Sequence, residues 1–412
     1  MLKVLAHSWP LLLGVMLLMV GNGVQGTLLG VRGALEHFTT FQLSIVMSAY
    51  FVGFLGGSRL APMMIRHVGH VRVFSALGSL ISAVLILYPL ILDWTAWSVM
   101  RVLIGFCFSG IYVTAESWLN NTATNETRGQ TLSAYMMVQM LGIIASQGLL
   151  AMGDPAGVGL FIIPSVLVSL AFMPILLADT PAPTFEDVQR MSFRRLFATS
   201  PLGCAGMLLT GGIYAGMFGM ASVWGAMRAL TFGQIAAYGA ALYIGGLVLQ
   251  YPIGWASDRI DRRVLIMWLS GSGAVLMAVA TVTHLPFTLI LCVALALGGI
   301  INPLYSLLIA LTNDYLQKED MPGASAGLIF LNGFGAIFGP LASGWFMAQI
   351  GAGGYFLFLG LLFLALAIYA AWRISRRSGP VEHASYTGLS PNASSLAVGA
   401  VMEKDPRRSR AG

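Results

Sequence analysis

Two ionisable residues lie inside one apolar stretch of the chain. Arg101 and Glu116 both fall within residues 95–119, which are otherwise apolar enough to cross a membrane as a helix. A charged side chain at the bilayer centre costs about 2.5 to 3.5 kcal/mol on insertion scales, so both should face protein or water rather than lipid. Their separation of 15 residues corresponds, on a helix, to a rise of about 22 Å and a rotation of about 60°. The pair predicts a helix beside a polar path through the membrane.

Uncharged polar and aromatic side chains recur in other apolar stretches. Asn22 and Gln25 are three residues apart and share one helix face. Amides inside a membrane need water or a neighbouring helix as a partner, and aromatic rings could stack on a flat heterocycle. For each of these residues, helix packing is the alternative to substrate contact. The predicted substrate-binding set is Asn22, Gln25, Arg101, Tyr112, Gln139, Tyr214, Tyr305 and Asn332.

The composition places these residues in a polytopic membrane protein. Of the 412 residues, 57% are hydrophobic and 9% are charged, whereas charged residues make up about 25% of soluble domains. A membrane helix needs about 20 apolar residues, and runs of that length occur twelve times. The predicted spans are residues 9–31, 41–64, 71–92, 95–119, 129–152, 157–178, 202–226, 234–256, 263–283, 285–311, 323–349 and 354–375.

The spans predict an all-α protein of two pseudo-symmetric halves with six helices each. The longest internal polar interval, residues 179–200, separates a first half at residues 1–178 from a second at 201–376. Residues 377–412 are rich in Ser, Gly, Pro and Arg and should form a disordered tail. A faint repeat links the halves, because Tyr112 and Tyr305 are each followed by an asparagine eight residues later. Six plus six corresponding helices are typical of transporters with a midplane site.

The basic residues predict the orientation in the membrane. Of the 22 Lys and Arg residues, 19 fall on the side of the N-terminus, and only Arg32, Arg101 and Arg228 lie elsewhere. Cytoplasmic loops carry such an excess, so both termini should be cytoplasmic, and the net charge of +6 needs no nucleic-acid partner. The cysteines Cys107, Cys204 and Cys292 all lie in predicted spans, where they indicate core packing rather than a disulfide or metal site.

A polar loop after the eighth span carries a recognisable pattern. Residues 254–263 read Gly-Trp-Ala-Ser-Asp-Arg-Ile-Asp-Arg-Arg, which resembles the cytoplasmic loop signature of the major facilitator superfamily. The resemblance implies secondary transport by rocking of two halves, with Asp258, Arg259 and Arg262 at a conformational latch and basic groups over the cytoplasmic mouth. The matching turn of the first half has Ala61 where the family usually has aspartate, so the latch is expected to be asymmetric.

Several short runs resemble one bacterial branch of this superfamily, which includes riboflavin importers and copper importers. They are residues 21–27, 68–74, 116–120 and 250–254. Copper members resemble one another in a Met-x-x-x-Met pair in span seven and a His-x-x-x-Met pair in span eight, whereas this chain has Met217 and Met220 at a different spacing and no such His. Drug-proton antiporters carry a Gly-Pro-rich motif in span five, which here is absent.

These observations predict a transporter of a bacterial inner membrane. The expected activity is import of a small organic solute, with riboflavin or a similar planar metabolite as the first choice. The alternatives are copper import, drug or metabolite export against protons, and a non-transporting sensor or assembly factor. Glu116 is either a proton carrier or a structural latch to Arg128 or to the loop of Arg59. We expect a monomer in the lipid bilayer, with no enzyme activity, cofactor or resident metal.

Overall fold

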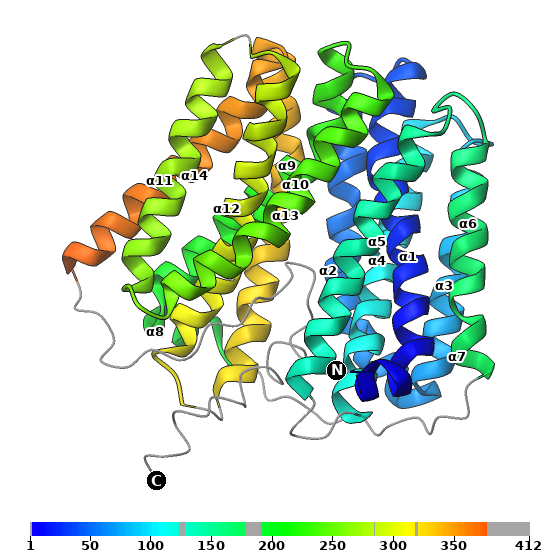
Figure 1. Ribbon diagram of the computed structural model, residues 1–412, viewed down its shortest axis with the longest axis horizontal. Helices are drawn as coiled ribbons and strands as arrows, with labels where there is room; N and C mark the ends of the chain where they lie inside the picture. Colours follow the sequence, from blue (N-terminus) through cyan, green and yellow to red (C-terminus); the bar gives the residue numbers. More distant parts are fainter. Residues whose placement is uncertain (1, 123–127, 178–190, 284, 318–319, 377–412) are drawn as a thin grey trace.

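In the part of the chain that the computed structural model describes, all regular secondary structure is helical. The structure gives the backbone of residues 2–122, 128–177, 191–283, 285–317 and 320–376, and the side chains of these residues outside 2–8, 121–122, 128–129 and 177. Twelve helical segments are long and apolar enough to span a membrane, the sixth of them being formed by α6 and α7 together, which confirms the predicted fold class. The helices (Figure 1) are α1 (Leu2–Leu35), α2 (Thr40–Val68), α3 (His70–Leu87), α4 (Trp94–Thr122), α5 (Arg128–Ala151), α6 (Gly159–Ala171), α7 (Met173–Leu177), α8 (Phe193–Thr199), α9 (Pro201–Met227), α10 (Phe232–Ser257), α11 (Arg262–Val282), α12 (Phe287–Asn313), α13 (Met321–Ile350) and α14 (Gly353–Arg376).

Most observed boundaries fall within about five residues of the predicted ones, but α1 begins at Leu2 instead of residue 9, and α6 ends at Ala171 before the short helix α7. The third span ends at Leu87 rather than at residue 92, because Pro89 cannot donate to the preceding turn. The segment expected to be a polar linker contains a short helix, α8, whose first turn is capped by the Ser192 side chain accepting from the Arg195 amide. Residues 178–190 of that linker and the predicted tail at 377–412 lie outside the described residues.

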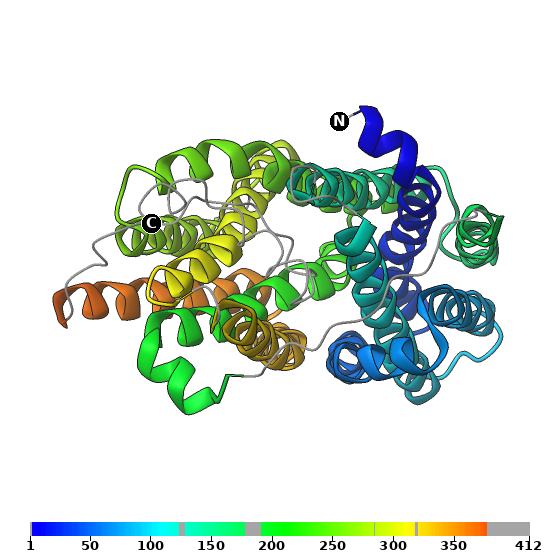
Figure 2. The ribbon, with the colours of Figure 1, turned by 90° about the horizontal axis from the view of Figure 1, so that it is seen from below.

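The membrane helices form two bundles that lie side by side. Helices α1 to α7 make the first bundle and α9 to α14 the second (Figures 1 and 2). At the junction, α2 packs against α13 on one flank and α5 against α10 on the other, while α1 contacts α9 in the centre. The membrane face at which α1 begins is called the N-terminal face below, and the opposite one the far face.

The two bundles repeat the same local structures at a constant spacing. Thr39 caps α2 through a reciprocal capping box with Gln42, and Thr231 caps α10 in the same way with Gln234. We call the offset from Thr39 to Thr231 the repeat interval. The same interval separates His37 from Ala229, which are the described non-glycine residues with positive φ. Such an unusual backbone repeated at one spacing indicates that the two halves are copies of one six-helix unit.

Paired glycines allow equivalent helices to approach closely in each half. A Cβ atom on Gly105 of α4 would overlap the carbonyl oxygen of Tyr50 on α2, and one on Gly298 of α12 would overlap that of Leu242 on α10. Small residues at helix contacts let backbones come together where apolar packing drives association in lipid. The spacing of the two glycines matches the repeat interval to within one position.

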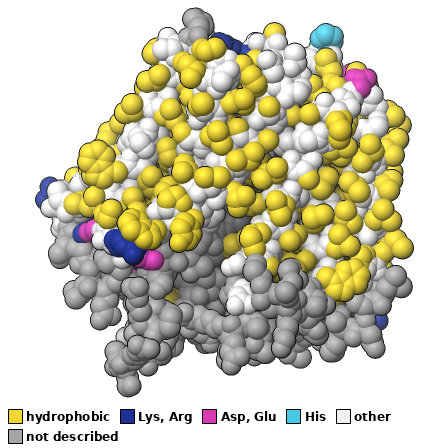
Figure 3. All heavy atoms as spheres, in the orientation of Figure 1, with side chains coloured by type: hydrophobic (Ala, Val, Ile, Leu, Met, Phe, Trp, Pro, Cys, Tyr) yellow, Lys and Arg dark blue, Asp and Glu magenta, His cyan; other side chains and the backbone are white. Residues whose placement is uncertain are grey.

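The lateral surface of the molecule is apolar. Figure 3 shows hydrophobic side chains over the sides of both bundles, with the described charged groups near the two ends. Val99, Trp268 and Val275 are examples, with 62%, 68% and 65% of each side chain exposed. A surface of this kind suits acyl chains, so the polar groups inside the spans must find partners or water within the protein.

Candidate functional site

A cavity lies at the junction of the two bundles. Its empty volume is about 830 Å³, and it is partly open. We call it the seam cavity. Its lining comes from α1, α2, α4 and α5 of the first half and from α9 and α10 of the second, namely Asn22, Gly23, Gly26, Thr27, Tyr50, Phe51, Arg101, Ile143, Gln147, Tyr214, Phe218, Gly219, Ala221, Ser222, Ile235, Gly239, Leu242 and Tyr243.

The internal repeat contributes to this lining in pairs. The repeat interval separates Asn22 from Tyr214 and also Phe51 from Tyr243, and all four residues line the cavity. Equivalent positions of the two six-helix units therefore face one another across the seam. The side chains differ within each pair, so the cavity is symmetric in backbone and asymmetric in chemistry.

Arg101 lines the seam cavity from α4 and is 5% exposed. Its Nη1 atom donates to Oε1 of Gln25 at 3.0 Å, and its guanidinium carbon lies 4.7 Å from the centre of the Tyr50 ring. Gln25 in turn donates to the hydroxyl of Tyr88 at 3.1 Å, which fixes the amide that holds the arginine. The orientation of Arg101 is thus set by neutral groups from α1 and α2.

Asn22 lines the cavity next to this arginine, and Tyr112 lies behind it. The Asn22 amide donates to the Tyr112 hydroxyl at 3.2 Å, and that hydroxyl donates to the sulfur of Met19 at 3.4 Å. Tyr112 is 1% exposed and does not line the cavity. It positions Asn22, whose remaining amide valences are available to a solute.

Aromatic rings from the second half form the opposite wall. The Phe218 ring lies 4.6 Å from Tyr214 and is stacked on Tyr243 at 4.4 Å between centroids. All three rings line the cavity and are half-buried. A continuous aromatic surface of this kind favours a flat ring system.

Contacts between the halves close the seam toward the far face. A Cβ on Gly30 of α1 would overlap the Ser222 hydroxyl on α9, and one on Gly344 of α13 would overlap Ser44 on α2. Thr27 of α1 donates to Gln147 of α5 at 3.3 Å, and a Cβ on Gly239 of α10 would meet that same glutamine at 2.9 Å. Gly30, Ser222, Ser44 and Gly344 all lie toward the far ends of their helices.

Glu116 and two of the predicted binding residues lie in a separate cluster outside the cavity lining. Glu116 is fully buried, and its carboxylate interacts with the side chain of Tyr135, as does Gln139. Tyr305 of the second half is near enough to Glu116 for an electrostatic interaction, and its hydroxyl has no hydrogen-bond partner in the described structure. The side chain of Arg128, one of the two latch partners considered for Glu116, is outside the described residues.

Asn332 faces the neighbouring helix rather than the cavity. Its amide nitrogen donates to the carbonyl of Met207 at 3.1 Å and to the Thr210 hydroxyl at 3.5 Å, both on α9. The residue is 7% exposed and does not line the seam cavity. In this conformation Asn332 joins α13 to α9.

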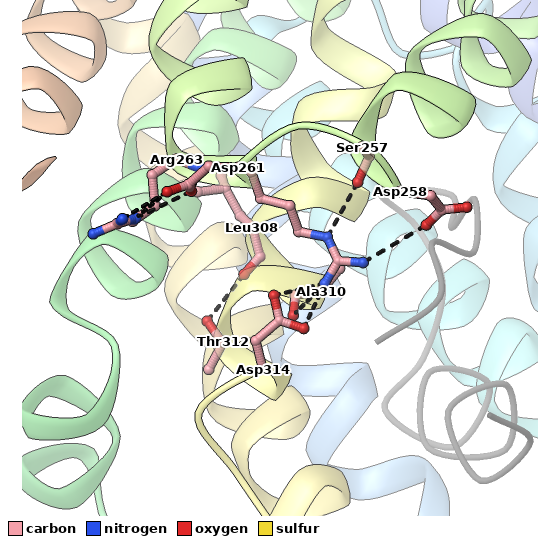
Figure 4. A network of polar contacts seen from close by, with 9 residues as sticks. Ser257, Asp258, Asp261, Arg263, Leu308, Ala310, Thr312 and Asp314 are labelled. Atoms are coloured by element: carbon pink, nitrogen blue, oxygen red, sulfur yellow. Dashed lines mark hydrogen bonds and ion pairs between the residues drawn. The ribbon is translucent and has the colours of Figure 1, made fainter. Parts of the chain in front are cut away.

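The loop signature forms a buried ionic network rather than a basic rim. Arg262 donates through Nη1 to both carboxylate oxygens of Asp314 at 2.5 and 2.6 Å, and through Nε to the Ser257 hydroxyl at 3.1 Å. Asp258 lies at 3.9 Å from the same guanidinium. Figure 4 shows Ser257 at the end of α10, Asp258 in the loop that follows it and Asp314 after the end of α12 converging on one guanidinium. Arg262 has no solvent exposure, so it is not part of an exposed basic rim, and its role in a conformational latch stays a prediction.

Asp314 was not among the residues predicted from the sequence, and two other arginines lie apart from this network. Asp314 directly follows the last residue of α12, and an acidic residue at such a position is expected to be a solvated loop residue. Arg259 lies in the loop after α10 and folds back over the end of that helix, with its guanidinium carbon 4.0 Å from the Trp255 ring centre. Arg59 lies 4.5 Å from the ring centre of Phe330 on α13, so it bridges the two halves instead of holding Glu116.

Comparison with known proteins gives the family. A model described as Major Facilitator Superfamily matches residues 222–402, and one described as Sugar (and other) transporter matches residues 12–182. The uncharacterised MFS-type transporter YcaD of Escherichia fergusonii is 23% identical over 375 residues, covering 90% of this chain and 97% of that protein. The chain belongs to the major facilitator superfamily. It is thus a multi-pass membrane transporter of the MFS type.

Solved structures share the fold of this MFS transporter. The crystal structure of the nucleoside transporter NupG superposes with a TM-score of 0.73 at 14% identity, covering 90% of this chain and 99% of that one. A bacterial homologue of the human lysosomal transporter Spinster, in an inward-facing and occupied conformation, superposes with a TM-score of 0.69 at 16% identity, covering 89% of this chain and 96% of that one.

A further relative in sequence is an uncharacterised MFS-type transporter of Yersinia enterocolitica. It is 28% identical over 268 residues, which cover 63% of this chain and 70% of that one. These relatives carry no riboflavin or copper assignment, so the narrower branch predicted from short runs gains no support from them.

Proposed function

We propose that this MFS transporter imports a small planar organic solute by alternating access, with the solute bound in the seam cavity. The observation that carries the proposal is the cavity itself, which is lined by both halves and combines one guanidinium and amides with an aromatic wall. Alternating access in such folds proceeds by rocking one repeat against the other around a fixed site. The contacts at Gly30 and Gly344 close the far side, which is the arrangement required for release toward the N-terminal face.

Orientation and location complete the proposal. The excess of basic residues on the N-terminal side supports a cytoplasmic N-terminal face and residence in a bacterial inner membrane. In that orientation, a cavity closed at the far face is closed to the outside. A solute in this cavity would therefore be released to the cytoplasm, which is the last step of uptake.

Riboflavin is the first compound to test, because its ring system is flat and bears hydrogen-bond acceptors. The structural neighbour NupG is a nucleoside transporter, and nucleosides are also small molecules with a planar heterocycle. Copper fits the cavity less well, since the positive charge of Arg101 repels a cation. Loss of the three-ring wall should weaken the binding of a planar solute, because each ring pair that no longer stacks removes about 0.5 to 1.5 kcal/mol.

The test is uptake into proteoliposomes and rescue of a riboflavin-auxotrophic bacterium, with the native chain, Tyr243→Ala and Trp268→Ala. Trp268→Ala is the matched control, because that ring is 68% exposed on the lateral surface. Uptake by the native chain and by Trp268→Ala, with loss in Tyr243→Ala, would support the proposal. Absence of uptake of riboflavin and of every other flat solute tried, by a correctly folded native protein, would refute it.

A further inference from the structure

The seam cavity carries an uncompensated positive charge. Among its lining residues, Arg101 is the one whose side chain is ionised at neutral pH, since the others are apolar, amide, hydroxyl or phenol groups. In the part of the chain that the structure describes, no carboxylate lies within 4.0 Å of the Arg101 guanidinium. A buried charge without an opposite charge is costly, so a partner anion has much to gain at this site.

Donors of this guanidinium remain unused. An arginine presents five N–H groups, and here Nη1 binds the Gln25 oxygen while Nη2 makes a 3.7 Å contact with the sulfur of Met47. The Nε atom is buried and has no hydrogen-bond partner among the described residues. Sulfur is a weak acceptor. The edge of the guanidinium formed by Nε and Nη2 is therefore available to a stronger hydrogen-bond acceptor.

The internal repeat argues that this arginine is not required for packing. Tyr50 lies against Gly105 of α4, and Leu242 lies against Gly298 of α12. The two glycines occupy equivalent positions in the two halves. Four residues before these glycines stand Arg101 in the first half and Ala294 in the second, and Ala294 is fully buried. The second half therefore makes this helix contact with the methyl group of Ala294 at that position. The first half makes it with Arg101, whose cationic side chain lines the cavity.

We infer that the solute is a planar organic anion whose carboxylate binds the free edge of Arg101 while its ring system packs on Tyr214, Phe218 and Tyr243. This inference rests on the proposed function and specifies its substrate class. A carboxylate accepts two parallel N–H bonds from a guanidinium, and such charge-assisted bonds are about twice as strong as neutral ones. Riboflavin is uncharged at neutral pH, so on this inference it is a weaker ligand than a flat acid of similar size.

The experiment compares acids with amides of the same shape. Binding of nicotinate and nicotinamide, benzoate and benzamide, and indole-3-acetate and indole-3-acetamide is measured on the purified full-length chain by thermal shift and by calorimetry. In each pair the ring is constant and the charge differs. For at least one pair, we expect the acid to bind with a dissociation constant at least about tenfold lower than that of the amide.

Variants of the arginine connect this preference to the site. In Arg101→Gln the ratio should fall to about one, and in Arg101→Lys it should be intermediate, because lysine keeps the charge and loses the fork. The control is Arg376→Gln, which removes a charge from an exposed residue at the end of α14 and should keep the native ratio. The native protein alone already gives a decisive reading if Arg101→Gln does not fold.

Each outcome bears on one of the two claims. If no acid is preferred over its amide by the native chain, or if the preference survives in a folded Arg101→Gln, the inference is overturned. If riboflavin or an amide enters proteoliposomes at least as well as the acids do, the proposed function stands and the anionic substrate class is rejected. If no flat compound of either charge binds or is transported, the proposed function itself fails.

Discussion

The guanidinium of Arg262, in the first turn of α11, binds both carboxylate oxygens of Asp314 at the end of α12, and neither side chain has any solvent exposure. Ser257 at the end of α10 accepts from the same guanidinium, so three helices of the second half meet at one buried charge. The counterpart of Arg262 in the first half, one repeat interval earlier, is His70, which contacts the Ser117 hydroxyl at 3.0 Å. The same interval pairs Asp258 with Arg66 rather than with Ala61, so the two halves differ in the chemistry that joins these helix ends.

Breaking this ion pair should destabilise the second half strongly. Removing one partner of a buried pair costs about 3 to 5 kcal/mol, because the other charge is left uncompensated. We expect that loss in the free energy of unfolding for Asp314→Ala, measured by denaturant titration in detergent. Arg259→Ala, which removes an exposed arginine of the same loop, should change it by about 0.5 kcal/mol or less. Equal effects of the two variants would show that the network does not hold the helices together.

The close helix contacts make a second stability prediction. Gly298→Ala places a methyl group against the backbone carbonyl of Leu242, and overpacking of this kind costs about 1 to 3 kcal/mol. Gly271→Ala in α11 meets no atom within 4 Å, so it should be neutral or should stabilise by up to about 1 kcal/mol. Thermal unfolding of both variants measures the difference, and a melting temperature of Gly298→Ala at or above that of Gly271→Ala would contradict the described packing.

Two asparagines should respond differently to truncation. Asn332→Ala loses the bonds from α13 to α9 and should reduce stability by about 0.6 to 1.7 kcal/mol, with solute affinity nearly unchanged. Asn22→Ala alters the cavity lining and should raise the dissociation constant of the transported solute about tenfold. Binding and unfolding measured on both variants separate the roles. A larger loss of affinity in Asn332→Ala than in Asn22→Ala would reverse the assignment.

Glu116 is expected to act as a structural residue. It lies outside the cavity lining and is buried against Tyr135, near Tyr112 and Tyr305. We expect Glu116→Gln to lower the free energy of unfolding by about 1 to 3 kcal/mol while uptake keeps its native dependence on external pH. Uptake measured between pH 5 and pH 8 checks this. A variant that is as stable as the native chain but has lost its pH dependence would instead identify Glu116 as a proton carrier.

The sequence predicted the helices and part of the cavity for a common reason. Spans were found because apolar runs of membrane length are separated by polar loops, and Arg101 because a charge inside such a run must face the interior. Whether an amide faces a cavity or a neighbouring helix depends on the rotation of packed helices, which explains why Asn22 and Asn332 could not be told apart. Tyr50 was missed because a tyrosine in an apolar run is most often core or interface.

Charged residues at helix ends were the hardest to place. Asp314 follows a predicted span and looks like any solvated loop residue until α11 brings Arg262 onto it. The pairing depends on two helices that are distant in sequence, so no local pattern reveals it.

The most direct test of the account is the accessibility of Thr27 from the two sides of the membrane. In a chain whose three cysteines are replaced by serine, Thr27→Cys is treated with a membrane-impermeant thiol reagent applied from inside or outside oriented vesicles. We predict labelling from both sides, because the seam cavity opens to each in turn, and slower labelling when a transported solute is present. A residue that labels from neither side, under conditions that label an exposed loop cysteine fully, would contradict a water-filled passage between the halves.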